Sequence, residues 1–154
     1  MKLLKATIYD LADILELQKS AFRSVAEILN NSKIQPLVQT YNEILSEFNQ
    51  GTFLKCVSEN DGVICGSVRA YLDDDGTCHV GKLIVAENMR RKGIGKILIF
   101  EIEKYFPNCK NFALFTGEIT PYTRRLYESA GYKVVSEKNT DDVKMLFMEK
   151  PNKS

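Results

Sequence analysis

The segment Arg90-Arg91-Lys92-Gly93-Ile94-Gly95-Lys96 concentrates cationic side chains and glycines. An apolar run of strand type precedes it and apolar residues at helical spacing follow, so we expect a loop that opens a helix. The first amides of a helix lack internal partners and carry partial positive charge, and glycines let a ligand approach the backbone closely. Cations are unfavourable at this end of a helix, and a bound anion would reverse that sign. The segment therefore predicts a phosphate or pyrophosphate site, against the alternative of a solvated basic cap with incidental glycines.

The spacing of the glycines decides which phosphate ligand fits. A Walker loop would need a glycine at Arg90 and a Ser or Thr at Ile97, and a dinucleotide fingerprint would need a glycine at Leu98. The spacing that is present is Arg-x-x-Gly-x-Gly, preceded by Leu83-Ile84-Val85. This pattern resembles the acetyl-CoA signature of the GNAT N-acetyltransferase superfamily.

A second stretch, Thr120 to Tyr132, resembles the later motif of the same superfamily, which is usually Asn-x-x-Ala-x-x-Leu-Tyr-Glu-x-x-Gly-Phe. Thr120 replaces the usual Asn, which commonly contacts the cofactor, and Thr123 replaces the usual Ala. The two motifs occur in the right order, and the resemblance covers roughly Leu3 to Glu149. The residues that match in kind are Leu126, Tyr127, Glu128, Gly131 and Tyr132.

The resemblance implies a ligand and an activity. In the GNAT fold two parallel strands splay apart, and the co-substrate acetyl-CoA lies in the gap, where unpaired main-chain groups can bond it. The implied activity is direct, acetyl-CoA-dependent transfer of an acetyl group to a primary amine of a small molecule or peptide. The residues implied to bind acetyl-CoA are Leu83 and Val85 through their backbone, and Arg90, Arg91, Lys92, Gly93, Ile94, Gly95, Lys96 and Thr120.

Acyl transfer to an amine needs two proton transfers. A lysine-like amine has a pKa of about 10.4, so it must lose a proton before attack, and the departing thiolate, with a pKa of about 8.5, must gain one. The family places the helical tyrosine, here Tyr127, near the thioester sulfur, where its phenol can be the acid. From helix periodicity alone Tyr127 is a core residue beside Leu126.

The base that accepts the proton of the amine has three candidates. His79 is the only histidine, and strand alternation predicts that it shares a face with Gly81, Leu83 and Val85. A single histidine on a strand is more often structural. Glu118 lies in the loop before the Tyr127 helix, and a water chain without a dedicated side chain is the third candidate.

Composition bounds the class of protein. The 154 residues fit a single GNAT-like acetyltransferase domain spanning 1–154, and a net charge of +1 gives no global field for nucleic acid or an anionic membrane. The four cysteines show no paired metal spacing, so we expect buried free thiols and no metal site. No signal peptide or membrane-spanning run is evident, which predicts a cytoplasmic protein. Beyond the amine acceptor, the only partner left open is a second copy in a homodimer.

The expected fold is α+β, with a single mixed, mostly antiparallel sheet flanked by helices and a splayed parallel strand pair. The helix near Asp10 is expected to be capped by that residue and to reach about Phe22. The expected strands are Leu3–Ile8, Thr52–Ser58, Val63–Leu72 with a bulge at Gly66, Thr77–Val85, Phe112–Thr116, Tyr132–Ser136 and Val143–Met148. The expected helices begin at Asp10, Pro36, Ile94 and Thr120. They end at about Phe22, at Gly51, at Pro107-Asn108 and at about Ala130.

Two other functional classes compete with the enzyme. A non-catalytic acyl-CoA sensor on the same fold would be favoured by loss of Tyr127 or the loop glycines, and neither is lost. A nucleic-acid binder would use the basic loop and Arg124-Arg125, which the near-neutral net charge disfavours. The identity of the acceptor is not readable from Phe22–Pro36 or the Val63–Asp75 hairpin, the two regions expected to shape its site.

Overall fold

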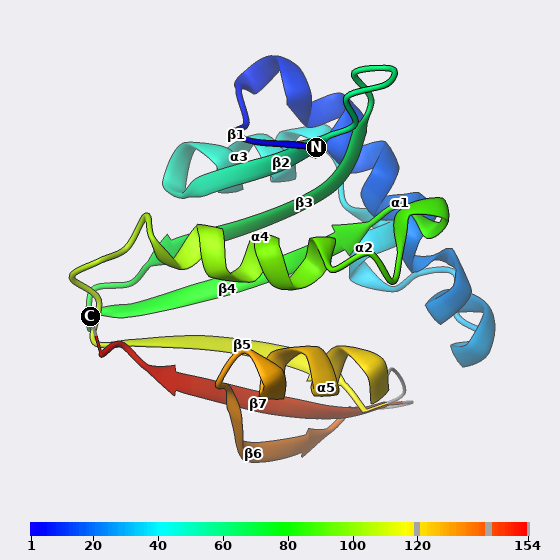
Figure 1. The fold of residues 1–154 in the computed structure, drawn as a ribbon. Coiled ribbons are helices and arrows are strands. Elements are labelled where there is room, and N and C mark those ends of the chain that lie inside the picture. The colour runs from blue at the N-terminus through cyan, green and yellow to red at the C-terminus, as the bar shows by residue number, and fades with distance from the viewer. Residues whose placement is uncertain (119–120, 141–142, 154) are drawn as a thin grey trace.

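The computed structural model describes residues 1–118, 121–140 and 143–153. Its core is a seven-stranded sheet with the order β1-β2-β3-β4-β5-β7-β6 (Figure 1). The elements, with η marking single 3₁₀ turns, are β1 (Lys2–Lys5), η1 (Ile8–Asp10), α1 (Leu11–Leu29), α2 (Gln35–Val38), α3 (Tyr41–Gln50), β2 (Thr52–Val57), β3 (Ile64–Leu72), β4 (Thr77–Val85), η2 (Glu87–Met89), α4 (Ile94–Glu103), β5 (Asn111–Gly117), α5 (Pro121–Ser129), β6 (Lys133–Asn139) and β7 (Lys144–Pro151).

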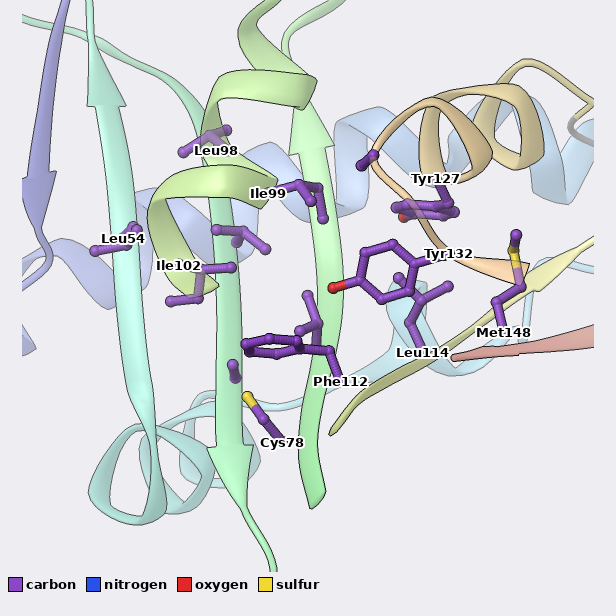
Figure 2. Packing of buried hydrophobic residues seen from close by; sticks show 14 of the residues in the cluster. Leu54, Cys78, Leu98, Ile99, Ile102, Phe112, Leu114, Tyr127, Tyr132 and Met148 are labelled. Atoms are coloured by element: carbon purple, nitrogen blue, oxygen red, sulfur yellow. The ribbon is translucent and has the colours of Figure 1, made fainter. Parts of the chain in front are cut away.

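Two helical layers cover the sheet. Helices α4 and α5 lie on one face, and α1 to α3 lie behind strands β1 to β4 on the other (Figure 1). The larger core, beneath α4 and α5, contains the fully buried Leu98, Ile99 and Ile102 of α4 (Figure 2). The smaller core joins Leu11 and Ile14 of α1 to the other sheet face. The mixed sheet flanked by helices confirms the expected fold class.

The meander β2-β3-β4 agrees closely with the sequence expectation. Its turns carry Gly62 and Gly76 at φ +71° and +90°, conformations that favour glycine. The bulge expected at Gly66 lies one residue earlier, because Cys56 and Val57 pair with Gly66 and Ile64 and leave Cys65 as the extra residue. The four cysteines are buried and free, as predicted.

The helices before the meander differ from the expectation. Helix α1 continues to Leu29 instead of ending near Phe22, because its amphipathic face persists to the buried Ala26. The single helix expected from Pro36 is two, α2 and α3. Thr40 adopts an extended conformation between them and forms a capping box with Glu43, which starts α3 afresh.

The expected cap of α1 is also wrong. Asp10 makes no side-chain capping bond to α1, because its carboxylate turns back and accepts a hydrogen bond from the Thr7 backbone N–H at 2.7 Å. The same carboxylate pairs with Lys55 Nζ at 2.9 Å, and these partners lower the pKa of Asp10 despite the cost of burial. Asp10 therefore ties the first turn of the chain to β2. No helix in the described part of the chain is long and apolar enough to cross a lipid bilayer.

The parallel pair β4–β5 is joined only at its beginning. Thr77, Cys78 and His79 pair with Asn111, Phe112 and Ala113, and no later pairing between the two strands occurs among the described residues. Both strands nevertheless continue, β4 to Val85 and β5 to Gly117. The two strands thus separate beyond His79, as a splayed pair requires.

Candidate active site

The loop between β4 and α4 presents a row of free amides. Helix α4 begins at Ile94, and its first backbone hydrogen bond runs from Ile97 N to Gly93 O. Among the described residues, no acceptor bonds any backbone N–H from Arg91 to Lys96. Arg91 and Gly93 adopt φ values of +67° and +79°, so the chain turns sharply into the helix. These amides can bond an anion at the positive end of α4.

The cations of the loop have no carboxylate partner within the described part of the chain. Arg91, Lys92 and Lys96 are exposed, and Lys92 Nζ contacts only Met89 Sδ, at 3.8 Å. Arg90 behaves differently, since its Nε donates to the carbonyl oxygen of Val85 at 3.3 Å. The loop therefore combines unpaired cations with unpaired amides, which suits phosphate groups.

Gly95 has a packing role that the sequence does not reveal. A Cβ at Gly95 would lie 3.1 Å from Leu126 Cδ2 of α5 and 3.6 Å from Leu83 Cδ2 of β4. The missing side chain thus lets α4 approach both α5 and the strand closely. At Gly93, by contrast, a Cβ would meet nothing within 4 Å, and the glycine there serves its positive φ.

Leu83 and Val85 lie at the end of β4, beyond the last pair with β5. Their side chains pack against the α4 core. The edge of β4 that faces the gap is therefore unpaired with β5 at both residues, whose backbone was expected to receive a ligand.

Tyr127 lies between α5 and the sheet, near Tyr132 and Leu114 (Figure 2). Tyr127 is 8% exposed. The centroid of its ring lies 6.2 Å from that of the Tyr132 ring, and the two ring planes are inclined at 64°. Tyr132 donates its own hydroxyl to Glu103 Oε2 at 2.8 Å, and burial raises the pKa of Tyr132. Both tyrosines are core residues by packing. The acid role expected of Tyr127 remains a prediction.

His79 does not share a face with Leu83 and Val85, contrary to the alternation expected from the sequence. Ser67 and Arg69 of β3 pair with Ile84 and Gly81, so β4 carries one extra residue in this interval, a β-bulge. The bulge reverses the alternation. Leu83 and Val85 pack on the α4 side, whereas Ile84 packs on the α1–α3 side.

The surroundings of His79 limit what it can do. Its Nε2 lies 2.7 Å from Asp73 Oδ2, and its ring stacks on Tyr71 at 4.9 Å. His79 precedes Val85 by six positions, roughly 20 Å along a strand. Hydrogen bonds from His79 and from the Thr77 and Asp75 amides lower the pKa of Asp73, so the Asp73 to Asp75 turn is internally satisfied. The histidine thus belongs to the hairpin end of β4, away from the basic loop.

The second candidate base, Glu118, directly follows the last residue of β5. Glu118 is exposed, and its carboxylate is 3.9 Å from Lys144 Nζ, which makes a shorter bond of 3.0 Å to Glu137. Thr120 lies outside the described residues. Thr123 of α5 shares a 2.9 Å hydrogen bond with Thr116 of β5, which anchors the helix to the strand.

The opposite face of the sheet carries a buried polar network that the sequence patterns do not predict. Arg69 of β3 donates to Glu47 Oε2 and to Gln18 Oε1, both at 2.7 Å, and its guanidinium lies over the Phe53 ring. Gln39 joins the network through Glu47 at 2.9 Å. The network links α1, α2 and α3 to β3, since Gln18 Nε2 also donates to the carbonyl oxygen of Pro36 in α2 at 3.0 Å. One feature of the sequence indicates polar residues on this face: Lys82 interrupts the apolar run Val80–Val85.

The structure brings together the basic loop and the unpaired end of β4, but not the candidate bases His79 and Glu118. The basic loop, the unpaired end of β4 and helix α5 meet around Gly95, where Leu83 and Leu126 approach. His79 and Glu118 lie elsewhere, at the hairpin end of β4 and at the end of β5. The meeting point offers free amides, cations and an unpaired strand edge, which together suit a long ligand with phosphates at one end.

Comparisons with known proteins agree on family and fold. The sequence profile of the Acetyltransferase (GNAT) family matches residues 11–132. A PaiA N-acetyltransferase from Thermoplasma acidophilum, solved with coenzyme A, has TM-score 0.81 at 17% identity over 97% of this chain and 98% of that one. A phosphinothricin acetyltransferase from Sinorhizobium meliloti, solved with acetyl-CoA, has TM-score 0.76 at 19% identity over 98% and 88%. A GNAT acetyltransferase from Staphylococcus aureus Mu50 has TM-score 0.79 at 18% identity over 99% of both chains. No curated protein sequence matches the chain.

Proposed function

The chain belongs to the acetyltransferase (GNAT) family, and from this premise we propose that it is an acetyl-CoA-dependent N-acetyltransferase acting on a primary amine of a small molecule or peptide. The observation that carries the proposal is the row of free amides from Arg91 to Lys96, which follows the end of β4 that is unpaired with β5. Structural relatives solved with coenzyme A or acetyl-CoA support the choice of ligand.

In this proposal the chain holds the co-substrate at two places. The Arg91–Lys96 amides and the cations beside them bind the pyrophosphate, because their hydrogen bonds and charges are otherwise unused in the described part of the chain. The unpaired backbone of Leu83 and Val85 bonds the amide groups of the pantetheine arm. Arg90 must then exchange its bond to Val85 O for a phosphate, or else leave that carbonyl partly occupied.

Acetyl-CoA supplies an activated acyl group. The reaction forms a bond from the acceptor nitrogen to the acyl carbon and breaks the bond from that carbon to sulfur, so that the amine loses one proton and the thiolate gains one. We assign the second proton to the hydroxyl of Tyr127, a buried residue of α5. A phenol is able to donate a proton to a departing thiolate.

The proton of the amine leaves by one of three routes. His79 Nε2 is engaged by Asp73 Oδ2, so only Nδ1 is left for an incoming amine. Glu118 is exposed, and its carboxylate is shared with Lys144. A water chain needs neither. His79 remains the preferred side chain because it directly precedes the point where the strands separate.

Two measurements on the intact protein test the proposal. Calorimetry should show saturable binding of acetyl-CoA. Acetate and free adenosine serve as controls. Release of free thiol during incubation with a panel of primary amines should identify an acetylated product by mass spectrometry. Binding without turnover of any amine or peptide would favour a non-catalytic acyl-CoA sensor. Absence of acetyl-CoA binding would contradict the proposal.

A further inference from the structure

The face of β4 toward α1–α3 carries a lysine that no described residue neutralises. Lys82 is half-buried and makes neither a hydrogen bond nor an ion pair with any residue of the described chain. It occupies the bulge of β4 at φ +48°, a left-handed conformation that is unfavourable for a residue with a Cβ. A lysine here is costly in both backbone conformation and desolvation, and such costs concentrate at functional sites.

The nearby charges leave Lys82 unsatisfied. Burial lowers the pKa of Lys82, the Arg69 guanidinium lowers it further, and Glu47 offsets only part of the effect. Both carboxylate oxygens of Glu47 are already used, Oε2 by Arg69 at 2.7 Å and Oε1 by Gln39 at 2.9 Å. Two cations therefore share one carboxylate on this face, and there is an uncompensated positive charge.

Open space adjoins these cations at Gly81. A Cβ at Gly81 would meet no heavy atom within 4 Å, and its φ is not positive, so the backbone does not demand glycine there. Gly81 pairs directly with Arg69, which places both positions on the same face of the sheet. Arg69 is 6% exposed, yet its Nε has no hydrogen-bond partner among the described residues. The space at Gly81 thus adjoins Lys82 along β4, whose ammonium has no partner among the described residues, and Arg69 Nε is a further unused donor buried on the same face.

We propose that the space at Gly81 binds an acidic group of the acceptor, so that the acetylated amine also carries a carboxylate, as an amino acid does. The inference rests on the proposed N-acetyltransferase function and names its substrate class. A carboxylate there can accept a hydrogen bond from Lys82 Nζ, and its negative charge offsets the half-buried ammonium beside the Arg69 guanidinium. A phosphate ester of an amino alcohol has the same charge chemistry.

The position of the space suits an acceptor. The basic loop serves the end of β4 that leads into α4, whereas Gly81 and Arg69 lie on the α1–α3 face, so the phosphates of acetyl-CoA and the acid of the acceptor would not compete for cations. Pairing of β4 with β5 ends at His79, two residues before Gly81. An acid held at Gly81 therefore leaves its amine beside the gap between the strands.

The test compares matched acceptors that differ only in the acid. Leucine, leucinamide and isopentylamine form one series, and phosphoethanolamine with ethanolamine forms the second, which separates phosphate from carboxylate. Thiol release should give at least tenfold higher kcat/KM for leucine than for its amide or amine. Lys82→Asn keeps a residue that tolerates the left-handed conformation and should abolish this preference through KM, without changing the KM for acetyl-CoA. Lys133→Asn, at an exposed lysine of β6, is the control and should keep the preference.

Binding of a product analogue tests the site without turnover. N-acetylglycine, titrated by calorimetry into the protein with and without coenzyme A, should bind at least tenfold more tightly than N-acetylglycinamide, and Gly81→Ala or Lys82→Asn should remove the difference. Equal affinities, a preference for uncharged amines, or an acetyl group found on Lys82 itself would overturn the proposal. If leucine and isopentylamine are turned over equally, the acid site fails while the N-acetyltransferase function stands. If acetyl-CoA does not bind, the function fails, and the N-acetylglycine titration still decides the acid site.

Discussion

Gly95 of α4 and Leu126 of α5 approach so closely that a Cβ on the glycine would lie 3.1 Å from Leu126 Cδ2. The contact joins α4, the helix that follows the basic loop, to α5, the helix that carries Tyr127. Gly95 therefore positions two halves of the candidate site relative to each other, in addition to any role in admitting a ligand.

The first prediction separates these two roles. Gly95→Val should destabilise the protein by about 1–3 kcal/mol, since overpacking forces Leu126 or Leu83 to move. At roughly 2–4 °C per kcal/mol for a domain of this size, the melting temperature should fall measurably. The double variant Gly95→Val with Leu126→Ala should recover part of the loss. If the single variant melts like wild type, the packing role is wrong, and any loss of acetyl-CoA affinity then belongs to the ligand alone.

The second prediction concerns the loop cations. Arg91→Gln and Lys92→Gln should each weaken acetyl-CoA binding by about fivefold, roughly 1 kcal/mol, because both side chains are exposed and have no carboxylate partner among the described residues. Calorimetry at two salt concentrations should show that the difference shrinks as salt rises. Lys133→Gln, at an exposed lysine outside the site, should bind normally. Affinities that are equal to wild type at low salt would remove these cations from the phosphate site.

The third prediction concerns the acid. Tyr127→Phe keeps the ring that packs beneath α5 and removes only the hydroxyl. General acid–base groups contribute about 10²–10⁴-fold, so single-turnover rates should fall by that factor, equivalent to roughly 2.7–5.5 kcal/mol. Acetyl-CoA affinity and the melting temperature should change little. A wild-type single-turnover rate between pH 6 and 9 would assign Tyr127 to the core alone.

The fourth prediction is a pH dependence of stability. The folded pKa of Lys82 is lowered by burial and by Arg69, against the partial opposition of Glu47, so the unfolded chain binds a proton more tightly than the folded one. The ammonium therefore destabilises the fold fully below the folded pKa, and the penalty disappears as pH rises toward the unfolded value of about 10.4. Lys82→Met should accordingly be more stable than wild type at pH 7, with an advantage that shrinks up to pH 10.

Urea denaturation of both proteins across this range measures the difference directly, and other titrating groups cancel between them. Lys82→Gly gives a second comparison, since it removes the charge and also relieves the left-handed backbone at φ +48°. An advantage of Lys82→Met that stays constant from pH 7 to pH 10 would contradict the assignment of a lowered pKa to this lysine.

The sequence by itself determined the features that depend on short stretches of chain. The strand Thr77–Val85, the start of α4 at Ile94 and the free amides before it follow from local periodicity, turn chemistry and the unpartnered first turn of a helix. The two glycine-bearing motifs, Arg90–Lys96 and Thr120–Tyr132, likewise identified the family that the profile match to residues 11–132 confirms.

Tertiary structure decided which residues share a surface. The bulge at Lys82–Leu83 exists only relative to Val68 on the neighbouring strand, and one extra residue there moved His79 off the face of Leu83 and Val85. The same pairing set Gly81 beside Arg69, and the packing of three helices on β3 supplied Gln18, Gln39 and Glu47 from distant segments. Strand register and helix packing are non-local, because they depend on what lies across the sheet. The sequence could therefore locate the cofactor loop, but not the polar face on which we place the acceptor.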